Sequence, residues 1–167
     1  MIRLSTRLTT VYDHLIPNED VWDFCCDHGY VGTAAYKSEK FKSIYFVDPV
    51  ISILKKLESQ FYQYAYRKEN PSNAHFILQK GQFIDKPVSG TASIVGVGGL
   101  LIYEILEGVS GNNLLQAQRL ILGPHRDSEK LLTLLKSNAL FNDYKLSSQI
   151  EVLEKDRTRA ILVFDRV

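Results

Sequence analysis

The feature that most constrains the fold is a regular alternation of short β-rich runs and longer helical runs along the chain. Such alternation is typical of βαβ units, in which helices cover a mostly parallel sheet. The chain has 167 residues, 45% of them hydrophobic and 23% charged, which suits one domain with an ordinary core. We therefore predict a single α/β domain over residues 1–167.

Hydrophobic spacing locates the elements of this domain. Strands are predicted at Val21–Cys25, Ser43–Val47, His75–Gln79, Ala92–Gly96, Arg119–Leu122, Tyr144–Ile150 and Arg159–Phe164. Helices are predicted at Thr6–Leu15, Val31–Glu39, Val50–Lys68, Leu100–Gly108 and Ser128–Asn138. Only a short polar turn separates the last two strands, so we expect them to pair antiparallel. A seven-stranded, mostly parallel sheet with a C-terminal hairpin and helices on both faces is the Rossmann-like pattern of class I methyltransferases.

The first candidate site follows the first predicted strand, because ligands of open α/β sheets bind beyond the carboxyl ends of the strands. Gly29 would let the backbone and the next helix N-terminus approach a ligand closely. The four consecutive residues 25–28 cannot converge tetrahedrally on one ion, and the sequence holds no second ligand cluster, so we expect no metal. Cys25 and Cys26 fit better as small, largely apolar side chains beside a cofactor.

The next two predicted strands also end in candidate ligand-binding residues. Asp48 lies 21 residues after Asp27, near the spacing at which an acid accepts hydrogen bonds from ribose hydroxyls. The alternative for Asp48 is a turn residue before Pro49. After the third strand, Gln82 could bond to an adenine edge and Phe83 could stack on it. A plain polar turn is the alternative there.

Glycines and a histidine follow the fourth and fifth predicted strands. Gly96, Gly98 and Gly99 stand where strand meets helix, and glycine there permits close packing against a ligand. After the fifth strand, His125 could serve as a substrate-facing base or donor, because histidine titrates near neutral pH. The alternative is a solvated His125 beside Asp127, which would cap the next helix.

Composition limits the partners. Lys and Arg number 20 against 19 Asp and Glu, so a nucleic acid would have to meet locally clustered basic residues. Aromatic and cationic residues alternate at the end of the predicted helix Val50–Lys68. Candidates for a partner surface there are Tyr62, Tyr66, Arg67 and Lys68. No apolar run is long enough to span a membrane, and the N-terminus lacks a signal-peptide core. With only two cysteines, which are adjacent, the expected location is the cytoplasm.

Seven segments together resemble the bacterial tRNA (adenine-22-N1)-methyltransferase family, in the right order and over nearly the whole chain. They are Arg7-Leu8 before the first helix, residues 23–30, residues 47–49, Gly81, residues 94–102 and residues 120–125, with Ile16-Pro17 between the first two. The pair Asp27-His28 followed by Gly29-Tyr30, together with Gly96-Val97-Gly98-Gly99, is more specific than a lone glycine loop.

The resemblance implies an enzyme that transfers a methyl group from S-adenosylmethionine to RNA, and to tRNA in particular. It implies no DNA or membrane partner and leaves the oligomeric state open. Matching motifs imply that the catalytic residues are Asp27 and His28. The implied cofactor-binding residues are Arg7, Asp23, Cys25, Asp27, Gly29, Asp48, Pro49, Gly81, Gln82, Phe83, Gly96, Val97 and Gly98. The implied substrate residues are Gly99, Pro124, His125 and Arg126.

The sequence departs from the family pattern at several positions. Cys25 and Cys26 replace a glycine and a serine, Gln82 replaces an aspartate, and Val97 replaces a methionine. Family members also continue into a helical extension that this sequence does not include. Two alternatives therefore stay open: a methyltransferase for a small molecule or protein, and a non-catalytic homologue that binds the cofactor or RNA.

Overall fold

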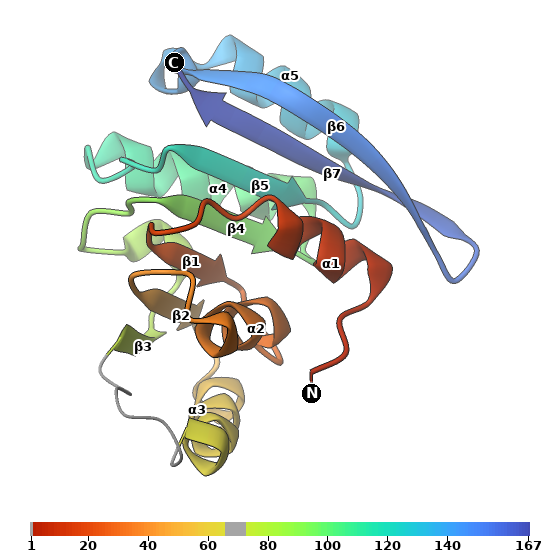
Figure 1. The fold of residues 1–167 in the computed structure, drawn as a ribbon. Coiled ribbons are helices and arrows are strands. Elements are labelled where there is room, and N and C mark those ends of the chain that lie inside the picture. Colours follow the sequence, from red (N-terminus) through yellow and green to blue (C-terminus); the bar gives the residue numbers. More distant parts are fainter. Residues whose placement is uncertain (1, 66–72) are drawn as a thin grey trace.

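Seven strands form one sheet in the order β3-β2-β1-β4-β5-β7-β6 (Figure 1). The computed structural model describes residues 2–65 and 73–167. The strands are β1 (Val21–Phe24), β2 (Ile44–Asp48), β3 (Ala74–Leu78), β4 (Thr91–Val95), β5 (Arg119–Gly123), β6 (Tyr144–Glu154) and β7 (Arg157–Arg166). The first five are parallel, and β7 pairs antiparallel with both β5 and β6. The predicted parallel sheet with a C-terminal antiparallel hairpin is confirmed.

Helices cover both faces of the sheet. They are α1 (Thr6–Asp13), α2 (Tyr30–Ser38), α3 (Ile51–Ala65), α4 (Gly99–Gly111) and α5 (Ser128–Ser137). One core cluster joins α1, α2 and α3 to the sheet through Val11, Val31 and Leu54. A second joins α4 and α5 to it through Ile102 and Leu131. The two clusters lie on opposite faces, so the carboxyl edge of the sheet opens between two helical layers.

The central strand β1 is buried throughout, as expected for a parallel strand covered on both faces. Trp22 and Phe24 are almost fully buried on it, and Asp23 is the single charged residue of the strand. Burial of one carboxylate in the middle of an apolar sheet costs free energy unless a partner compensates. Asp23 is therefore a site candidate on physical grounds alone.

Helix α1 is attached to the sheet by polar contacts as well as by its apolar face. Ser5 caps it by accepting from Leu8 N at 3.3 Å. Arg119 on β5 donates to the carbonyl oxygen of His14 at 3.0 Å and to the Asp165 carboxylate at 2.7 Å. Arg119 is the first residue of β5, so its bond to His14 fixes the C-terminal end of α1 at the amino end of that strand.

Most predicted element ends match within one or two residues, but β6 ends four residues later and α4 three residues later than predicted. In the hairpin, β6 continues to Glu154 and β7 starts at Arg157, because the turn between them takes two residues where four were expected. The first helix ends at Asp13 rather than Leu15. The predicted end of the helix Val50–Lys68 lies outside the described residues, and so do the partner-surface candidates Tyr66, Arg67 and Lys68.

The described ranges bear on two expectations from the sequence, a membrane span and a metal site. No helix within them is both long and apolar enough to cross a membrane. The same ranges hold no group of three or more His, Cys, Asp or Glu side chains that could bind a metal ion.

Candidate active site

A cavity of about 280 Å³ opens at the carboxyl ends of β1 and β4, beneath α1. Seven of the residues predicted from the sequence line it: Arg7, Asp23, Cys25, Asp27, His28, Gly96 and His125. They come from α1, from β1 and its loop, and from the loops after β4 and β5. The parallel sheet brings them together because its strands all end at the same edge.

Asp23 and Ser93 face this cavity from the middle of the sheet. They lie opposite each other in the register of β1 and β4, and they are 8% and 1% exposed. The Asp23 carboxylate accepts a hydrogen bond from Gly32 N at 3.1 Å. The Ser93 Oγ is buried and, within the described part of the chain, has no hydrogen-bond partner. An unpartnered buried hydroxyl that lines a cavity is available to hydrogen-bond to a ligand there.

Burial raises the pKa of Asp23 from 3.8 to about 7. The hydrogen bond from Gly32 N opposes this rise, and the nearby negative charge of Asp48 adds to it. The carboxyl group is thus poised to ionise when a cationic group enters the cavity, because an adjacent positive charge favours the carboxylate.

Arg7 reaches the cavity from α1. Its Nε lies 3.4 Å from Glu154 Oε2 at the end of β6, and its side chain is 15% exposed. The geometry of this ion pair does not make a hydrogen bond, so the buried Nε has no hydrogen-bond partner among the described residues. A guanidinium with unused donors beside a cavity can bind a carboxylate in a bidentate way.

The loop from β1 to α2 is built on unusual backbone angles. Cys25 has φ +54°, Asp27 φ +45° and Gly29 φ +62°. A side chain at Gly29 would place its Cβ 2.6 Å from Leu57 Cδ1, which would have to move, and the positive φ would strain any side chain there. Cys25 keeps the left-handed conformation that glycine adopts without strain, which costs a non-glycine residue on the order of 1–2 kcal/mol.

The thiols of this loop are not nucleophiles. Burial, with the charges of Asp48 and Asp23, raises the pKa of Cys25 to about 12. Burial likewise raises the pKa of Cys26. Both side chains therefore stay protonated near neutral pH and act as packing groups, since the thiolate is the reactive form.

The strain at Cys25 leads to a stability prediction. Cys25→Gly should leave the free energy of unfolding within about 1 kcal/mol of the wild type, because the relief of strain offsets the greater flexibility of the unfolded chain. Cys25→Val should lower it by about 1–3 kcal/mol, because a β-branched residue tolerates positive φ poorly. Urea denaturation of both variants measures this. A valine variant as stable as the glycine variant would contradict the strain argument.

Asp27 and His28 form a solvent-facing pair at the mouth of the cavity. The Asp27 Oδ2 and His28 Nε2 atoms are 3.6 Å apart, and the side chains are 68% and 56% exposed. The His28 ring also stacks with Tyr30, with ring centroids 5.2 Å apart. A carboxylate and an imidazole at the edge of a cavity are suited to holding or moving a proton.

The loops after β4 and β5 are hydrogen-bonded to each other. Gly96 N donates to Gly123 O at 3.0 Å, His125 N to Val97 O at 2.8 Å, and Gly99 N to Arg126 O at 3.0 Å. The predicted substrate residues after β5, among them Pro124, therefore lie directly beside the predicted glycines after β4. A Cβ at Gly98 would lie 3.3 Å from Arg126 Nε, and one at Gly96 would lie 3.8 Å from His125 Nε2.

Three arginines surround His125. Desolvation lowers the pKa of His125, and the positive charges of Arg7, Arg159 and Arg126 lower it further. Arg159 also donates a hydrogen bond to the His125 carbonyl oxygen. The imidazole is therefore neutral near pH 7, while the arginines supply a local concentration of positive charge that the net charge of +1 does not reveal.

Asp48 and Pro49 end β2 next to this cavity but do not line it. The buried Asp48 accepts from Val50 N at 2.9 Å, which satisfies one carboxylate oxygen. Val50, Ile51 and Leu78 are 45%, 51% and 47% exposed, and Leu78 pairs in register with Asp48. Apolar side chains left open at the ends of β2 and β3 can receive a flat apolar ring.

The residues predicted to contact adenine, Gly81, Gln82 and Phe83, lie outside this cavity. Gly81 packs against Ile105 of α4, and a Cβ at Gly108 would lie 2.5 Å from the backbone oxygen of Gln82. Gly81, Gln82 and Phe83 form a 3₁₀ turn on the α4 face and do not line the cavity. Sequence reasoning missed a nearby alternative: Gln79, directly after β3, has a buried Oε1 with no hydrogen-bond partner among the described residues.

The chain matches a known family. A family model described as a methyltransferase domain matches residues 4–162, nearly the whole chain. The chain therefore belongs to this family of methyltransferase domains. No curated protein sequence matches it significantly.

Solved structures share the fold at low sequence identity. A protein from Listeria monocytogenes serotype 4b has a TM-score of 0.84 at 22% identity, over 99% of this chain and 69% of that chain. M. capricolum TrmK, solved with S-adenosyl-homocysteine, has a TM-score of 0.78 at 19% identity, over 98% of this chain and 69% of that chain. The B. subtilis M1A22 tRNA methyltransferase TrmK has a TM-score of 0.80 at 20% identity, over 100% of this chain and 68% of that chain.

Proposed function

We propose that this chain transfers a methyl group from S-adenosylmethionine to RNA, with N1 of an adenine in tRNA as the acceptor. The single observation that carries the proposal is the cavity with Asp23, Ser93 and Arg7 at the carboxyl ends of β1 and β4, in a methyltransferase-domain chain. Two TrmK structures with the same fold support it, one of them holding the demethylated cofactor.

The residues present fit this cofactor. Its methionine end carries an ammonium group and a carboxylate. The buried Asp23 carboxyl is complementary to the ammonium group, and the Arg7 Nε, which makes no hydrogen bond, is complementary to the carboxylate. Ser93 Oγ would serve as a further partner for either group. The Asp48 carboxylate suits the ribose hydroxyls, and the unpartnered Gln79 Oε1 suits the exocyclic amine of adenine.

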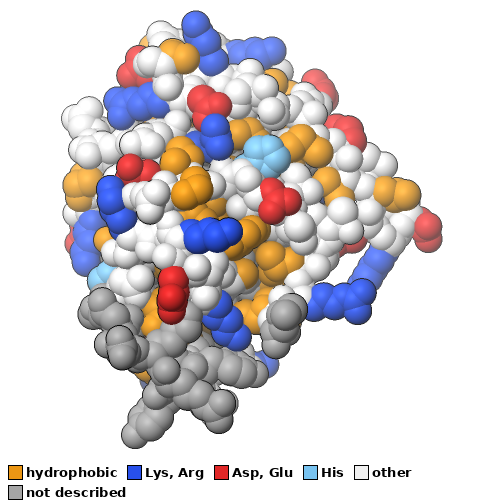
Figure 2. Space-filling view, viewed as in Figure 1, with side chains coloured by type: hydrophobic (Ala, Val, Ile, Leu, Met, Phe, Trp, Pro, Cys, Tyr) orange, Lys and Arg blue, Asp and Glu red, His pale blue; other side chains and the backbone are white. Residues whose placement is uncertain are grey.

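Local positive charge supports a nucleic-acid acceptor. Figure 2 shows Lys and Arg side chains scattered among acidic ones over one face of the molecule, without a single large basic patch. The arginines 7, 126 and 159 are instead gathered around His125, at the mouth of the cavity. Arg126 is 82% exposed there and could contact a phosphate.

The sulfonium of the bound cofactor supplies an already activated methyl group. The protein chiefly has to align the acceptor with that group, and alignment alone can contribute several kcal/mol to catalysis. Methylation at N1 leaves the adenine cationic until a proton leaves N6. The Asp27 carboxylate stabilises that charge and accepts the proton, while His125, held neutral by its arginine neighbours, can hydrogen-bond to the base.

Two measurements test this function. Calorimetry with S-adenosylhomocysteine should show binding, and the absence of binding would contradict every cofactor-dependent role. Incubation of bulk RNA with labelled S-adenosylmethionine, followed by nucleoside analysis, should yield 1-methyladenosine. Cofactor binding without label in RNA would favour the small-molecule or protein methyltransferase, or the non-catalytic homologue. The strained Cys25 in place of a glycine is the observation that favours the non-catalytic homologue.

A further inference from the structure

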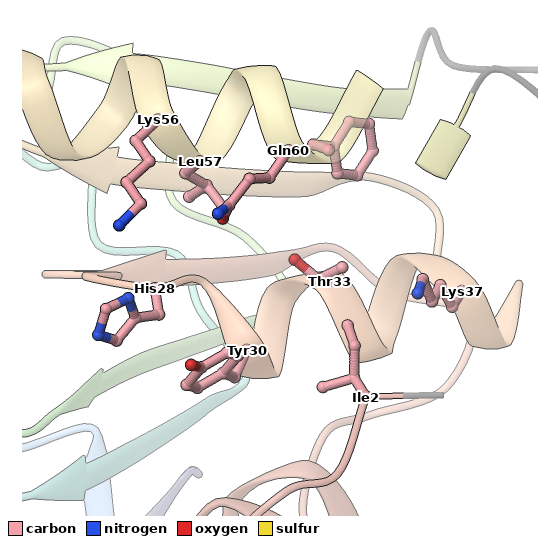
Figure 3. Close-up of a pocket in the computed structure, with 9 residues that line it drawn as sticks. Ile2, His28, Tyr30, Thr33, Lys37, Lys56, Leu57 and Gln60 are labelled. Carbon is pink, nitrogen blue, oxygen red and sulfur yellow. The ribbon is translucent and has the colours of Figure 1, made fainter. Parts of the chain in front are cut away.

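A second cavity, of about 360 Å³, lies between α2 and α3 (Figure 3). Tyr30, Thr33 and Lys37 line it from α2 at a spacing that places them on one helix face. Lys56 and Gln60 line it from α3, four residues apart. Neighbouring helices on one face of a sheet usually meet through apolar side chains. Here polar side chains of both helices line a cavity together with the apolar side chains Ile2, Leu57 and Phe61, and we call it the α2–α3 cleft.

The α2–α3 cleft adjoins the candidate active site. His28 lines the cleft, a smaller cavity of about 210 Å³ beside it, and the cavity at Asp23. Asp27 lines the smaller cavity and the cavity at Asp23. A ligand in the cleft would therefore lie next to the residues assigned to catalysis.

An exposed pair of rings stands at the junction. The His28 and Tyr30 rings stack with an interplanar angle of 28°. Tyr30 is 47% exposed, although a large aromatic side chain usually buries most of its surface. Exposed aromatic side chains beside a cationic groove are the means by which proteins stack unpaired bases.

Two cationic side chains line the cleft. Lys37 and Lys56 line it, and no Asp or Glu does so among the residues that the structure describes. Figure 3 shows Lys56, Leu57 and Gln60 directed from α3 towards α2, with the Lys56 amine end near the His28 ring. The lysine ammonium is a compact point charge that binds phosphate. The stacking pair and the phosphate-binding group thus line the same cleft.

We propose that the α2–α3 cleft is a nucleotide-binding subsite for single-stranded RNA. An unpaired base stacks on the His28–Tyr30 pair, and its phosphate contacts Lys56. This inference rests on the proposed function, because it places a nucleotide that flanks the target base beside the cavity at Asp23.

Salt-dependent binding of a fluorescently labelled tRNA transcript tests the phosphate contact. With the full chain saturated with S-adenosylhomocysteine, Lys56→Ala should weaken binding and reduce the slope of log K against log salt by about 0.7, the value for one lost contact to a single strand. Lys55→Ala is the matched control, because Lys55 is the adjacent exposed lysine and does not line the cleft. Equal slopes for the two variants would overturn the proposal.

Tyr30 tests the stacking contact. Tyr30→Ala should weaken transcript binding roughly 5- to 100-fold, the range of one lost base–aromatic stack. Tyr30→Phe keeps the ring and should bind as the wild type does. A phenylalanine variant as weak as the alanine variant would assign the effect to the hydroxyl and overturn the stacking role.

The remaining outcomes separate this inference from the proposed function. A wild-type chain that binds the transcript, with Lys56→Ala and Tyr30→Ala unaffected, overturns the subsite alone. A chain that binds S-adenosylhomocysteine but no transcript would contradict both the proposed RNA substrate and the subsite. It would still agree with S-adenosylmethionine as the cofactor. Adenosine monophosphate bound as tightly as the transcript would make the cleft a site for free nucleotides and overturn its assignment to RNA.

Discussion

Asp27→Asn is expected to lower the turnover number for RNA methylation by about 10²–10⁴-fold, the usual contribution of an acid–base group. Affinity for S-adenosylhomocysteine should be unchanged. The amide keeps the size and shape of the carboxylate but can neither carry the negative charge nor accept the N6 proton. Single-turnover assays with saturating cofactor and RNA measure the chemical step directly.

The fold should tolerate this substitution. The Asp27 side chain is 68% exposed, and its φ of +45° is one that asparagine adopts readily. Asp156→Asn is the matched control: Asp156 is also exposed with positive φ, in the β6–β7 turn, and does not line the cavity. If Asp27→Asn turns over as fast as Asp156→Asn, then Asp27 has a structural role and no catalytic one.

Asp23→Asn is expected to weaken cofactor binding. It should also remove most of the change in the free energy of unfolding with pH that the ionisation of Asp23 causes. In the ligand-free wild type the pKa of Asp23 rises from 3.8 to about 7 through burial. This rise corresponds to a cost of roughly 4 kcal/mol for ionised Asp23 in the folded protein.

The direction of the pH effect follows from the raised pKa. Below pH 4 Asp23 is protonated in both the folded and the unfolded chain, and this group costs no stability. Between about pH 4 and 7 the unfolded chain has lost the proton while the folded chain retains it, so the free energy of unfolding falls as pH rises. Above pH 7 both states are ionised and the loss is complete. Asparagine does not titrate, so the variant should lack this fall.

Urea denaturation at pH 5 and pH 8, with and without the substitution, measures the effect. In the same variant the affinity for S-adenosylhomocysteine at pH 8 should fall roughly 10- to 100-fold, because a hydrogen bond to a charged group is lost. Ser93→Ala is the companion variant: it should weaken binding by a smaller factor, roughly 2- to 10-fold, and leave the pH dependence intact. The same fall in stability from pH 5 to pH 8 in Asp23→Asn would contradict the role assigned to burial.

Several parts of the fold follow from local sequence patterns. The runs at Val21–Phe24 and Ile44–Asp48 are apolar enough to identify buried parallel strands, and the short polar turn before Arg157 implies an antiparallel hairpin. These signals are local, so they predict elements and their order. They also predict that Asp27 and His125 stand near the same sheet edge, because each follows a parallel strand.

Positions that depend on register or on packing between distant residues were not predictable in this way. Ser93 reads as an ordinary strand residue, and its place opposite Asp23 arises only from the pairing of β1 with β4. Gln82 follows the third strand as expected, but the chain crosses to the α4 face before reaching it, and Gln79 lies at the strand end instead.

The sequence by itself determined the α/β class, the order of the elements and the edge of the sheet at which the site lies, because periodicity and turn chemistry act over a few residues. The tertiary structure decided which polar groups are buried without hydrogen-bond partners, that Cys25 retains the backbone conformation typical of glycine, and that side chains of α2 and α3 line one cleft. Those features depend on desolvation and on contacts between residues far apart in the chain, for which no local pattern exists.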